Sequence, residues 1–222
     1  MTKAIIFDLD ETLVNRQATM ENFLLEQYQR FQDSLTLSAT TFITENLLAQ
    51  NNGYTEKLEA YGHFCRKHSQ NESLATQLYA DYIDHYGHGA ILFTGVLELL
   101  EDLSKGFTLA MITNGKTLCQ NRKIDGTGIR SFFKTIKISE EEGISKPEKS
   151  IFLNCIQDLE IEAEHCLFIG DHPVNDIVPA HELGMRTVWV ESDKYDAPPE
   201  ADSVVKMPSE LLALVSSPQL KS

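Results

Sequence analysis

Three acidic residues stand within four positions near the start of the chain, directly after an apolar run. The stretch is "KAIIFDLDETL" (residues 3–13), and its acidic residues are Asp8, Asp10 and Glu11. The apolar part favours a buried strand, and like charges at its end repel one another unless a positive group lies among them. A carboxylate can attack phosphorus to form an aspartyl-phosphate, while a second carboxylic acid can protonate the leaving oxygen and then activate water. The stretch therefore indicates a site for phosphoryl chemistry that also holds a cation.

Polar residues also follow later apolar runs. In chain order they are Thr113 and Asn114 in "ITNG", Lys146 in "SKP", and Asp171 and Asp176 in "GDHPVND". Binding sites in parallel α/β sheets form at the carboxyl ends of the strands, so we expect these residues to converge there with Asp8 and Asp10. Because side chains alternate along a strand, Asp8 and Asp10 should lie on the same side.

Two kinds of ligand contact are expected at this edge of the sheet. Asp8, Asp10 and Asp171 would form an oxygen-rich site for Mg²⁺, which prefers one or two carboxylates together with waters and phosphate oxygens. Thr113 and Lys146 would bind the remaining negative oxygens of a phosphorylated substrate. The cation would also remove the repulsion between the carboxylates.

The elements that must position these residues follow from the apolar pattern. Five short runs have strand character: Lys3–Asp8, Phe107–Thr113, Thr135–Ser139, Cys166–Gly170 and Arg186–Val190. Helical patterns separate most of them, including residues 95–104 and a helix expected to start at Pro147, since proline suits a first helical position. Continuous apolar strands alternating with helices indicate a parallel sheet covered on both faces. The predicted fold class is α/β with a Rossmann-like parallel sheet.

The segment from residue 14 to 87 has a different pattern, without strand character. Apolar residues recur there at spacings of three and four in four segments, which begin near Met20, Phe42, Leu58 and Leu74. This periodicity predicts an inserted α-helical cap, a four-helix bundle at 14–87, beside a core at 1–13 and 88–222. Within the cap, Arg16, Arg66 and Lys67 are either contacts to the distal part of a substrate or members of a solvated helix face.

Composition narrows the function classes further. The 222-residue chain has a net charge of -14, which argues against nucleic acid or an anionic membrane as a partner. It has no apolar run of about 18 residues and no signal-peptide pattern at its start, so no membrane span is expected. Four cysteines without CxxC spacing suit a cytoplasmic protein with reduced thiols. The expected partner is a small-molecule phosphate ester.

The motifs "FDLDETL", "ITNG", "SKP" and "GDHPVND" resemble, in order, the four motifs of the haloacid dehalogenase-like (HAD) hydrolase superfamily. The resemblance extends from residue 3 to about residue 190. A helical insert directly after the first motif is similar to the C1-capped subfamily I, which includes phosphoglycolate phosphatase-like enzymes. The resemblance implies a Mg²⁺-dependent phosphatase, a phosphoric monoester hydrolase, that acts on a small phosphorylated metabolite through an aspartyl-phosphate intermediate.

The resemblance also implies residue roles in the reaction. Asp8 would be the nucleophile and Asp10 the general acid and base. Mg²⁺ would be held by Asp8, the backbone carbonyl of Asp10, and Asp171. Thr113 and Lys146 would bind phosphate.

Further groups would assist in the same family pattern. Backbone N–H groups near Leu9, Asp10 and Asn114 would also contact the phosphate, and Asp176 would orient Lys146 or a metal-bound water. The sequence departs from the family pattern at Glu11, where glycine or aspartate is commoner, and at His172 and Pro173. The position of His172 makes it a candidate contact to the substrate or to the water shell of the metal.

Other functions fit parts of the same pattern. A dehalogenase of this fold lacks the second aspartate, so Asp10 argues against it. A phosphomutase of the same fold and, from a different class, a receiver-like or phosphate-binding regulatory protein without turnover stay open as alternatives. A regulator would be expected to lose Asp10 or Asp171, and the chain has both. The individual substrate and the oligomeric state do not follow from the sequence.

Overall fold

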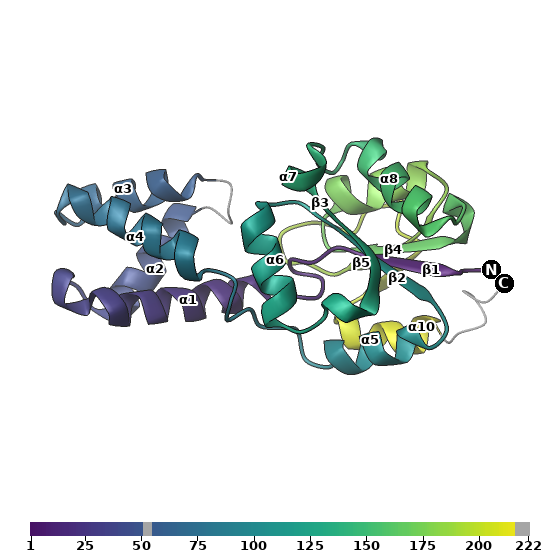
Figure 1. The fold of residues 1–222 in the computed structure, drawn as a ribbon, viewed down its shortest axis with the longest axis horizontal. Helices are drawn as coiled ribbons and strands as arrows, with labels where there is room; N and C mark the ends of the chain where they lie inside the picture. Colours follow the sequence, from purple (N-terminus) through teal and green to yellow (C-terminus); the bar gives the residue numbers. More distant parts are fainter. Residues whose placement is uncertain (51–54, 216–222) are drawn as a thin grey trace. The chain divides into compact units, whose positions relative to one another are not determined.

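The computed structural model describes residues 1–50 and 55–215. The chain forms two compact units, one of Met1–Asn15 with Ala90–Ser222 and one of Arg16–Gly89. The first is an α/β unit and the second is helical (Figure 1). No helix among the described residues combines the length and apolar character needed to cross a membrane.

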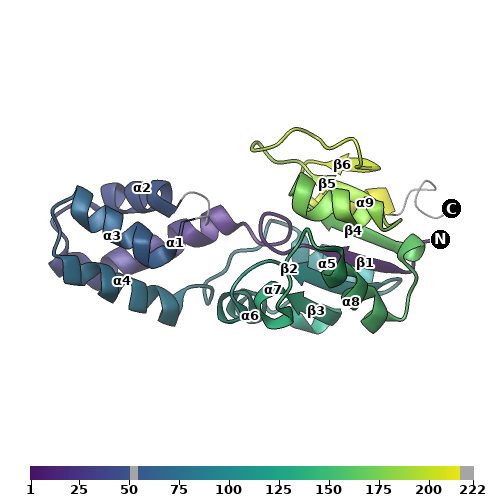
Figure 2. The same ribbon diagram turned by 90° about the horizontal axis from the view of Figure 1, so that it is seen from above.

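The α/β unit is built on one sheet of six parallel strands in the order β3-β2-β1-β4-β5-β6 (Figure 2). The strands are β1 (Ala4–Phe7), β2 (Thr108–Thr113), β3 (Phe133–Ile138), β4 (Cys166–Gly170), β5 (Arg186–Val190) and β6 (Ser203–Val205). Strand β1 is central, and its last residue, Phe7, pairs with Met111 of β2 and Ile169 of β4. The predicted α/β fold class is therefore confirmed.

Both faces of the sheet are buried at β1, β2, β4 and β5, which explains why these strands read as continuous apolar runs. Ile5 and Phe7 point into one core with α5 (Val96–Ser104) and α10 (Leu211–Val215). The alternate residues, Ala4 and Ile6, point into the opposite core, under helices α8 (Lys149–Leu159) and α9 (Val178–Glu182). Figure 1 shows α5 and α10 on one side of the sheet and α8 on the other. Burial of each such aliphatic or aromatic side chain contributes about 1.5–3 kcal/mol to the free energy of unfolding.

Two features of this unit differ from the sequence-based expectation. Helix α8 begins at Lys149 rather than Pro147, because Glu148 has extended dihedral angles (φ −61°, ψ 124°) as the residue before the helix. A sixth strand, β6, pairs with β5. The remaining helices of the unit, α6 (Thr117–Gly126) and α7 (Ser139–Glu142), follow β2 and β3.

The helical unit contains α1 (Arg16–Phe31), α2 (Ala39–Gln50), α3 (Lys57–Lys67) and α4 (Glu72–His85). Aromatic side chains fill its centre, where Phe42 and Phe64 meet edge to face at 5.2 Å. A buried polar group lies beside them: Gln27 donates to Asp81 at 2.9 Å, and the Arg30 guanidinium binds the same carboxylate at 2.7 Å. Lys67, for which the sequence left open a substrate contact or a solvated helix face, forms an ion pair with Glu45 at 2.6 Å within this unit.

Candidate active site

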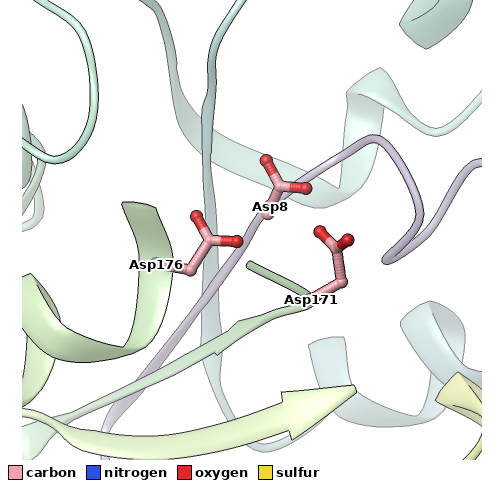
Figure 3. A group of neighbouring side chains, drawn as sticks. All are labelled: Asp8, Asp171 and Asp176. Carbon is pink, nitrogen blue, oxygen red and sulfur yellow. The ribbon is translucent and has the colours of Figure 1, made fainter. Parts of the chain in front are cut away.

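Asp8 and Asp171 lie side by side because they follow paired strands. Asp8 comes directly after β1, and its N–H donates to Ile169 of β4 at 2.9 Å, which continues the ladder by one residue. Asp171 comes directly after β4. With Asp176 they form a group in which one carboxylate oxygen from each residue lies within 4.8 Å of the other two (Figure 3).

Asp176 reaches this group through the single π-helical turn Pro173–Ile177. The His172 N–H donates to Oδ2 of Asp176 at 3.0 Å, and the Asp176 N–H donates to the carbonyl of His172 at 2.9 Å. Nδ1 of His172 accepts from the N–H groups of Val174 and Asn175, both at 3.2 Å. The imidazole that departs from the family pattern therefore caps the turn that carries Asp176.

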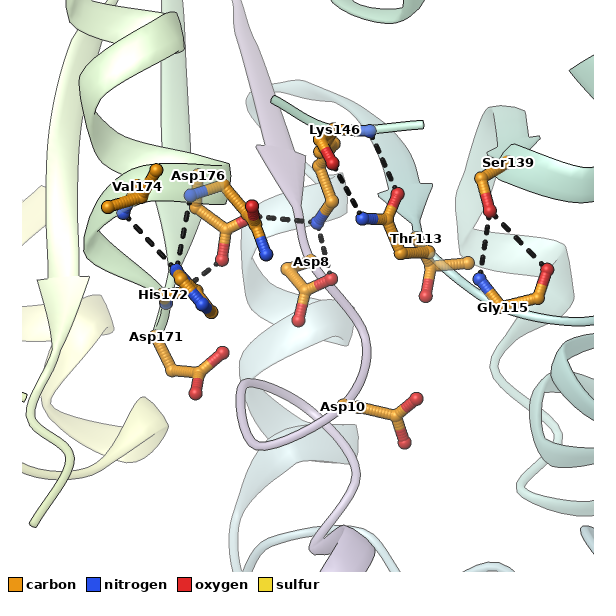
Figure 4. A network of polar contacts seen from close by, with 12 residues as sticks. Asp8, Asp10, Thr113, Gly115, Ser139, Lys146, Asp171, His172, Val174 and Asp176 are labelled. Atoms are coloured by element: carbon orange, nitrogen blue, oxygen red, sulfur yellow. Dashed lines mark hydrogen bonds and ion pairs between the residues drawn. The ribbon is translucent and has the colours of Figure 1, made fainter. Parts of the chain in front are cut away.

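Lys146 lies between two of the carboxylates. Its ammonium donates to Oδ1 of Asp8 at 2.6 Å and to Oδ1 of Asp176 at 2.7 Å, and the residue is only 4% exposed (Figure 4). Asn114 holds the Lys146 backbone: its Nδ2 donates to the Lys146 carbonyl and its Oδ1 accepts from the Lys146 N–H, both at 2.9 Å. The Asn114 side chain is thus engaged in placing Lys146, so any phosphate contact of Asn114 falls to its backbone N–H.

Thr113 ends β2, on the opposite side of β1 from β4. Its Oγ1 is buried and accepts a hydrogen bond from Nε2 of Gln120 at 2.6 Å. A hydroxyl that accepts in this way still has its own hydrogen to donate, as contact with a phosphate oxygen requires. The Leu9 side chain is fully buried, so a contact from Leu9 would also come from its backbone.

Asp10 does not lie where strand alternation places it. Figure 4 shows its carboxylate turned away from Asp8 and Asp171. Strand β1 ends at Phe7, and the chain turns at Glu11, which has a left-handed φ of 61°, so the two-residue repeat stops before Asp10. The Asp10 carboxylate accepts from Nζ of Lys123 at 2.7 and 2.8 Å, and from Nε2 of Gln120 at 3.0 Å.

Burial governs the electrostatics of the acidic group. Burial raises the pKa of Asp8 to about 7; Lys146 opposes this effect and Asp176 adds to it. Burial together with the negative charges of Asp8 and Asp176 raises the pKa of Asp171 to about 8. Burial alone would lower the pKa of Lys146, but the carboxylates of Asp176 and Asp8 raise it above its ordinary value. Burial lowers the pKa of His172, which favours the neutral ring.

The group suits a divalent cation. Three carboxylates against one ammonium leave a formal charge of −2 when all are ionised. Lys146 and the His172 N–H engage both oxygens of Asp176, whereas no hydrogen bond to the Asp171 carboxylate is found among residues 1–50 and 55–215. Two carboxylates together with waters and a phosphate oxygen would match the ligand preference of Mg²⁺. Asp8 and Asp171 are thus the side chains best placed to hold it.

Comparison with known proteins agrees with the predicted resemblance and confirms it. The family described as haloacid dehalogenase-like hydrolase matches residues 5–190. A glyceraldehyde 3-phosphate phosphatase of Methanocaldococcus jannaschii is 28% identical over 214 residues, which are 88% of this chain and 87% of the relative. The pyrimidine 5'-nucleotidase YjjG of Escherichia coli is 27% identical over 210 residues, 87% and 88% of the two chains. A crystal structure of YfnB from Bacillus subtilis bound to magnesium superposes with a TM-score of 0.78 at 24% identity, covering 97% of this chain and 99% of that one.

Proposed function

The chain belongs to the haloacid dehalogenase-like hydrolase family, and we propose that it is a Mg²⁺-dependent phosphatase that hydrolyses a small phosphate monoester through an aspartyl-phosphate on Asp8. One observation carries this proposal. Asp8 lies between the group expected to bind phosphate and the group expected to bind the metal. Lys146 binds its Oδ1, and the Asp171 carboxylate lies beside it. A nucleophile in this position would attack the phosphorus of a substrate whose phosphate oxygens are bound by the Lys146 ammonium and by the metal ion.

The first step transfers the phosphoryl group to Asp8. Oδ2 of Asp8 attacks phosphorus, because Oδ1 is bound by Lys146. The bond between phosphorus and the ester oxygen breaks, and Asp10 gives its proton to the departing alcohol. Lys146, the hydroxyl of Thr113 and backbone N–H groups of Leu9, Asp10 and Asn114 bind the non-bridging oxygens of the phosphoryl group in this proposal.

The second step releases phosphate. Asp10, now a carboxylate, takes a proton from a water molecule whose oxygen attacks phosphorus. The bond between phosphorus and Oδ2 of Asp8 breaks, which yields inorganic phosphate, the Asp8 carboxylate and a protonated Asp10 ready for the next cycle. Asp176 and His172 take no part in bond exchange and instead keep Lys146 in place.

Mg²⁺ would be held by Asp8, Asp171 and the backbone carbonyl of Asp10. When bound, the ion neutralises charge on the transferring phosphoryl group and offsets the repulsion between the carboxylates. The formal excess of two negative charges in this group supports this assignment, as does the magnesium bound by YfnB.

The helical unit is proposed to act as a cap that selects the substrate, with the domain bounds expected from the sequence, 14–87 for the cap and 1–13 with 88–222 for the core. Its cations Arg16 and Arg66 are candidates for contact with the part of the substrate beyond the phosphate. A small-molecule phosphate ester is the proposed partner, and the four free, buried cysteines suit the proposed cytoplasmic location.

The test is a hydrolysis assay with p-nitrophenyl phosphate, glyceraldehyde 3-phosphate and pyrimidine 5'-nucleotides, in the presence of Mg²⁺ or of EDTA. We expect turnover with Mg²⁺ and none with EDTA. Asp8→Asn should abolish turnover, whereas Asp102→Asn, which changes an exposed carboxylate, should leave it unchanged. Binding of phosphate esters without turnover by the unmodified protein would favour the regulatory alternative instead.

A further inference from the structure

Helix α6 presents a buried lysine to Asp10. Lys123 is 3% exposed, and its Nζ lies 2.7 and 2.8 Å from the two oxygens of the Asp10 carboxylate. The two residues are 113 positions apart in the chain, so the tertiary fold brings them together. A buried ion pair of this kind is costly to desolvate and is weak evidence for a purely stabilising role. Its position against the second aspartate of "FDLDETL" therefore calls for a functional reason.

Gln120, one turn earlier on α6, joins this pair to the phosphate-binding side of the site. Its Oε1 accepts from Nζ of Lys123 at 2.9 Å. Its Nε2 lies 3.0 Å from Oδ2 of Asp10 and 2.6 Å from Oγ1 of Thr113. The orientation of the Asp10 carboxylate is thus fixed relative to Thr113 through two side chains of one helix.

The glycine of "ITNG" makes room for this arrangement. Gly115 has a left-handed φ of 151°, and a Cβ atom built there would lie 2.9 Å from Cδ of Gln120 and 3.3 Å from its Nε2. Only a residue without a side chain allows Gln120 to lie against this turn. The sequence at the end of β2 therefore accommodates Gln120 as well as placing Thr113.

We propose that Lys123 is a positioning residue that, with Gln120, orients the carboxyl group of Asp10 for proton transfer to the leaving group. This inference rests on the proposed phosphatase function and extends it to a residue of α6 outside the four motifs. Lys123 contacts the carboxylate of Asp10 and the side chain of Gln120, and in this proposal it acts through Asp10. Its ammonium also stabilises the Asp10 carboxylate, the form seen in this ion pair, which is the product of proton donation in the first step and the base in the second.

The nature of the leaving group provides the test. An alkoxide is a poor leaving group and needs the proton from Asp10, whereas p-nitrophenolate departs without it. We compare kcat/KM, which reports the step that releases the alcohol, for p-nitrophenyl phosphate and for glyceraldehyde 3-phosphate or a pyrimidine 5'-nucleotide, whichever the unmodified enzyme turns over faster. Lys123→Met should lower the value for the alkyl ester by about 10²-fold, at the low end for general acid catalysis, and that for the aryl ester by less than about 10-fold.

Matched variants separate positioning from folding. Lys137→Met removes another largely buried lysine of the α/β unit that pairs with two carboxylates, Glu142 and Asp158, and should leave the ratio of the two kcat/KM values unchanged. Lys123→Gln serves in place of Lys123→Met if the methionine variant does not fold, as judged by circular dichroism. In an Asp10→Asn background, Lys123→Met should lower kcat/KM for the alkyl ester little further, because the group that Lys123 positions has already been removed.

Four results would overturn the inference. An equal loss on both esters would assign Lys123 to structure alone. An unchanged kcat/KM for the alkyl ester would mean that Asp10 does not need Lys123. A higher value would mean that Lys123 holds Asp10 in a non-productive orientation. If Lys123→Met lowers kcat/KM by the same factor in the Asp10→Asn background as in the unmodified enzyme, Lys123 acts through another group. If the unmodified enzyme hydrolyses neither ester, the proposed function itself fails and takes this inference with it.

Discussion

A Cβ atom at Gly170 would lie 2.5 Å from Oδ2 of Asp176, closer than real side-chain contacts allow. The last residue of β4 must therefore be a glycine for the Asp176 carboxylate to fold back against the strand and reach Lys146. Gly170→Ala should push Asp176 away and loosen the Lys146 ammonium. Because misplacing a catalytic group by about 1 Å can cost about 10²-fold, we expect a loss of that order in kcat/KM.

The control for this change is Gly106→Ala. A Cβ atom at Gly106 meets no other group within 4 Å, so this variant should keep its activity. Comparison of the two variants in the p-nitrophenyl phosphate assay, with thermal unfolding to verify the fold, isolates the contact at Asp176. Full activity of Gly170→Ala would show that the position of Asp176 does not matter to the reaction.

Removing Lys146 should strongly destabilise the metal-free α/β unit. Lys146→Met would leave Asp8 and Asp176 facing each other without a cation, and breaking a buried pair in this way costs about 3–5 kcal/mol. Urea unfolding in EDTA measures this cost, and adding Asp176→Asn should recover part of it. The comparison variant Lys149→Met loses a half-exposed pair with Glu182 and should change stability by about 0–1 kcal/mol. Equal, small effects would mean that the Lys146 pairs contribute little to the fold.

Magnesium should stabilise the protein more at alkaline than at acidic pH. The pKa of Asp8 is raised from 3.8 to about 7 and that of Asp171 from 3.8 to about 8 in the folded metal-free protein. A raised carboxyl pKa contributes stability that is complete below the unfolded value and is lost as pH rises through the folded value, here between about pH 4 and about pH 8. Mg²⁺ binds the ionised carboxylates, so its stabilising effect should grow over the same window.

Thermal unfolding with Mg²⁺ and with EDTA, at steps between about pH 5 and about pH 9, measures this difference. The melting temperature in EDTA should fall relative to that in Mg²⁺ as the pH rises. Asp8→Asn should reduce the gap, because it removes one ligand and one of the repelling charges. A gap that is the same at every pH, or no gap at all, contradicts the assignment of the cation to Asp8 and Asp171.

The sheet could be predicted from the sequence because the apolar runs that form its inner strands are strong signals and are local in the chain. The apolar run of β1 and the polar residues directly after β1, β2 and β4 are adjacent in sequence to the strands that carry them. Parallel pairing then brings Asp8 and Asp171 together without further information. Strand β6 escaped prediction because three residues, Ser203–Val205, are too short a run for a recognisable alternation.

The surroundings of Asp10 did not follow from strand periodicity. Alternation holds only while the strand lasts, and β1 ends three residues before Asp10. A signal for its partner was nevertheless present in the sequence. Gln120, Lys123 and Ile124 stand at positions i, i+3 and i+4 of α6, so they share one helix face, and Ile124 is fully buried. A lysine on a buried helix face needs an acidic partner, which points to a nearby carboxylate.

Trapping of the intermediate tests the central claim most directly. Asp10→Asn should still be phosphorylated by p-nitrophenyl phosphate, whose leaving group needs no acid, but should hydrolyse the intermediate slowly because the base is missing. Borohydride reduction of the quenched enzyme converts an aspartyl-phosphate to homoserine, and peptide mass spectrometry locates it. We predict homoserine at position 8, dependent on substrate and Mg²⁺. Homoserine at another aspartate, or none in a variant that still releases p-nitrophenolate, would contradict the account.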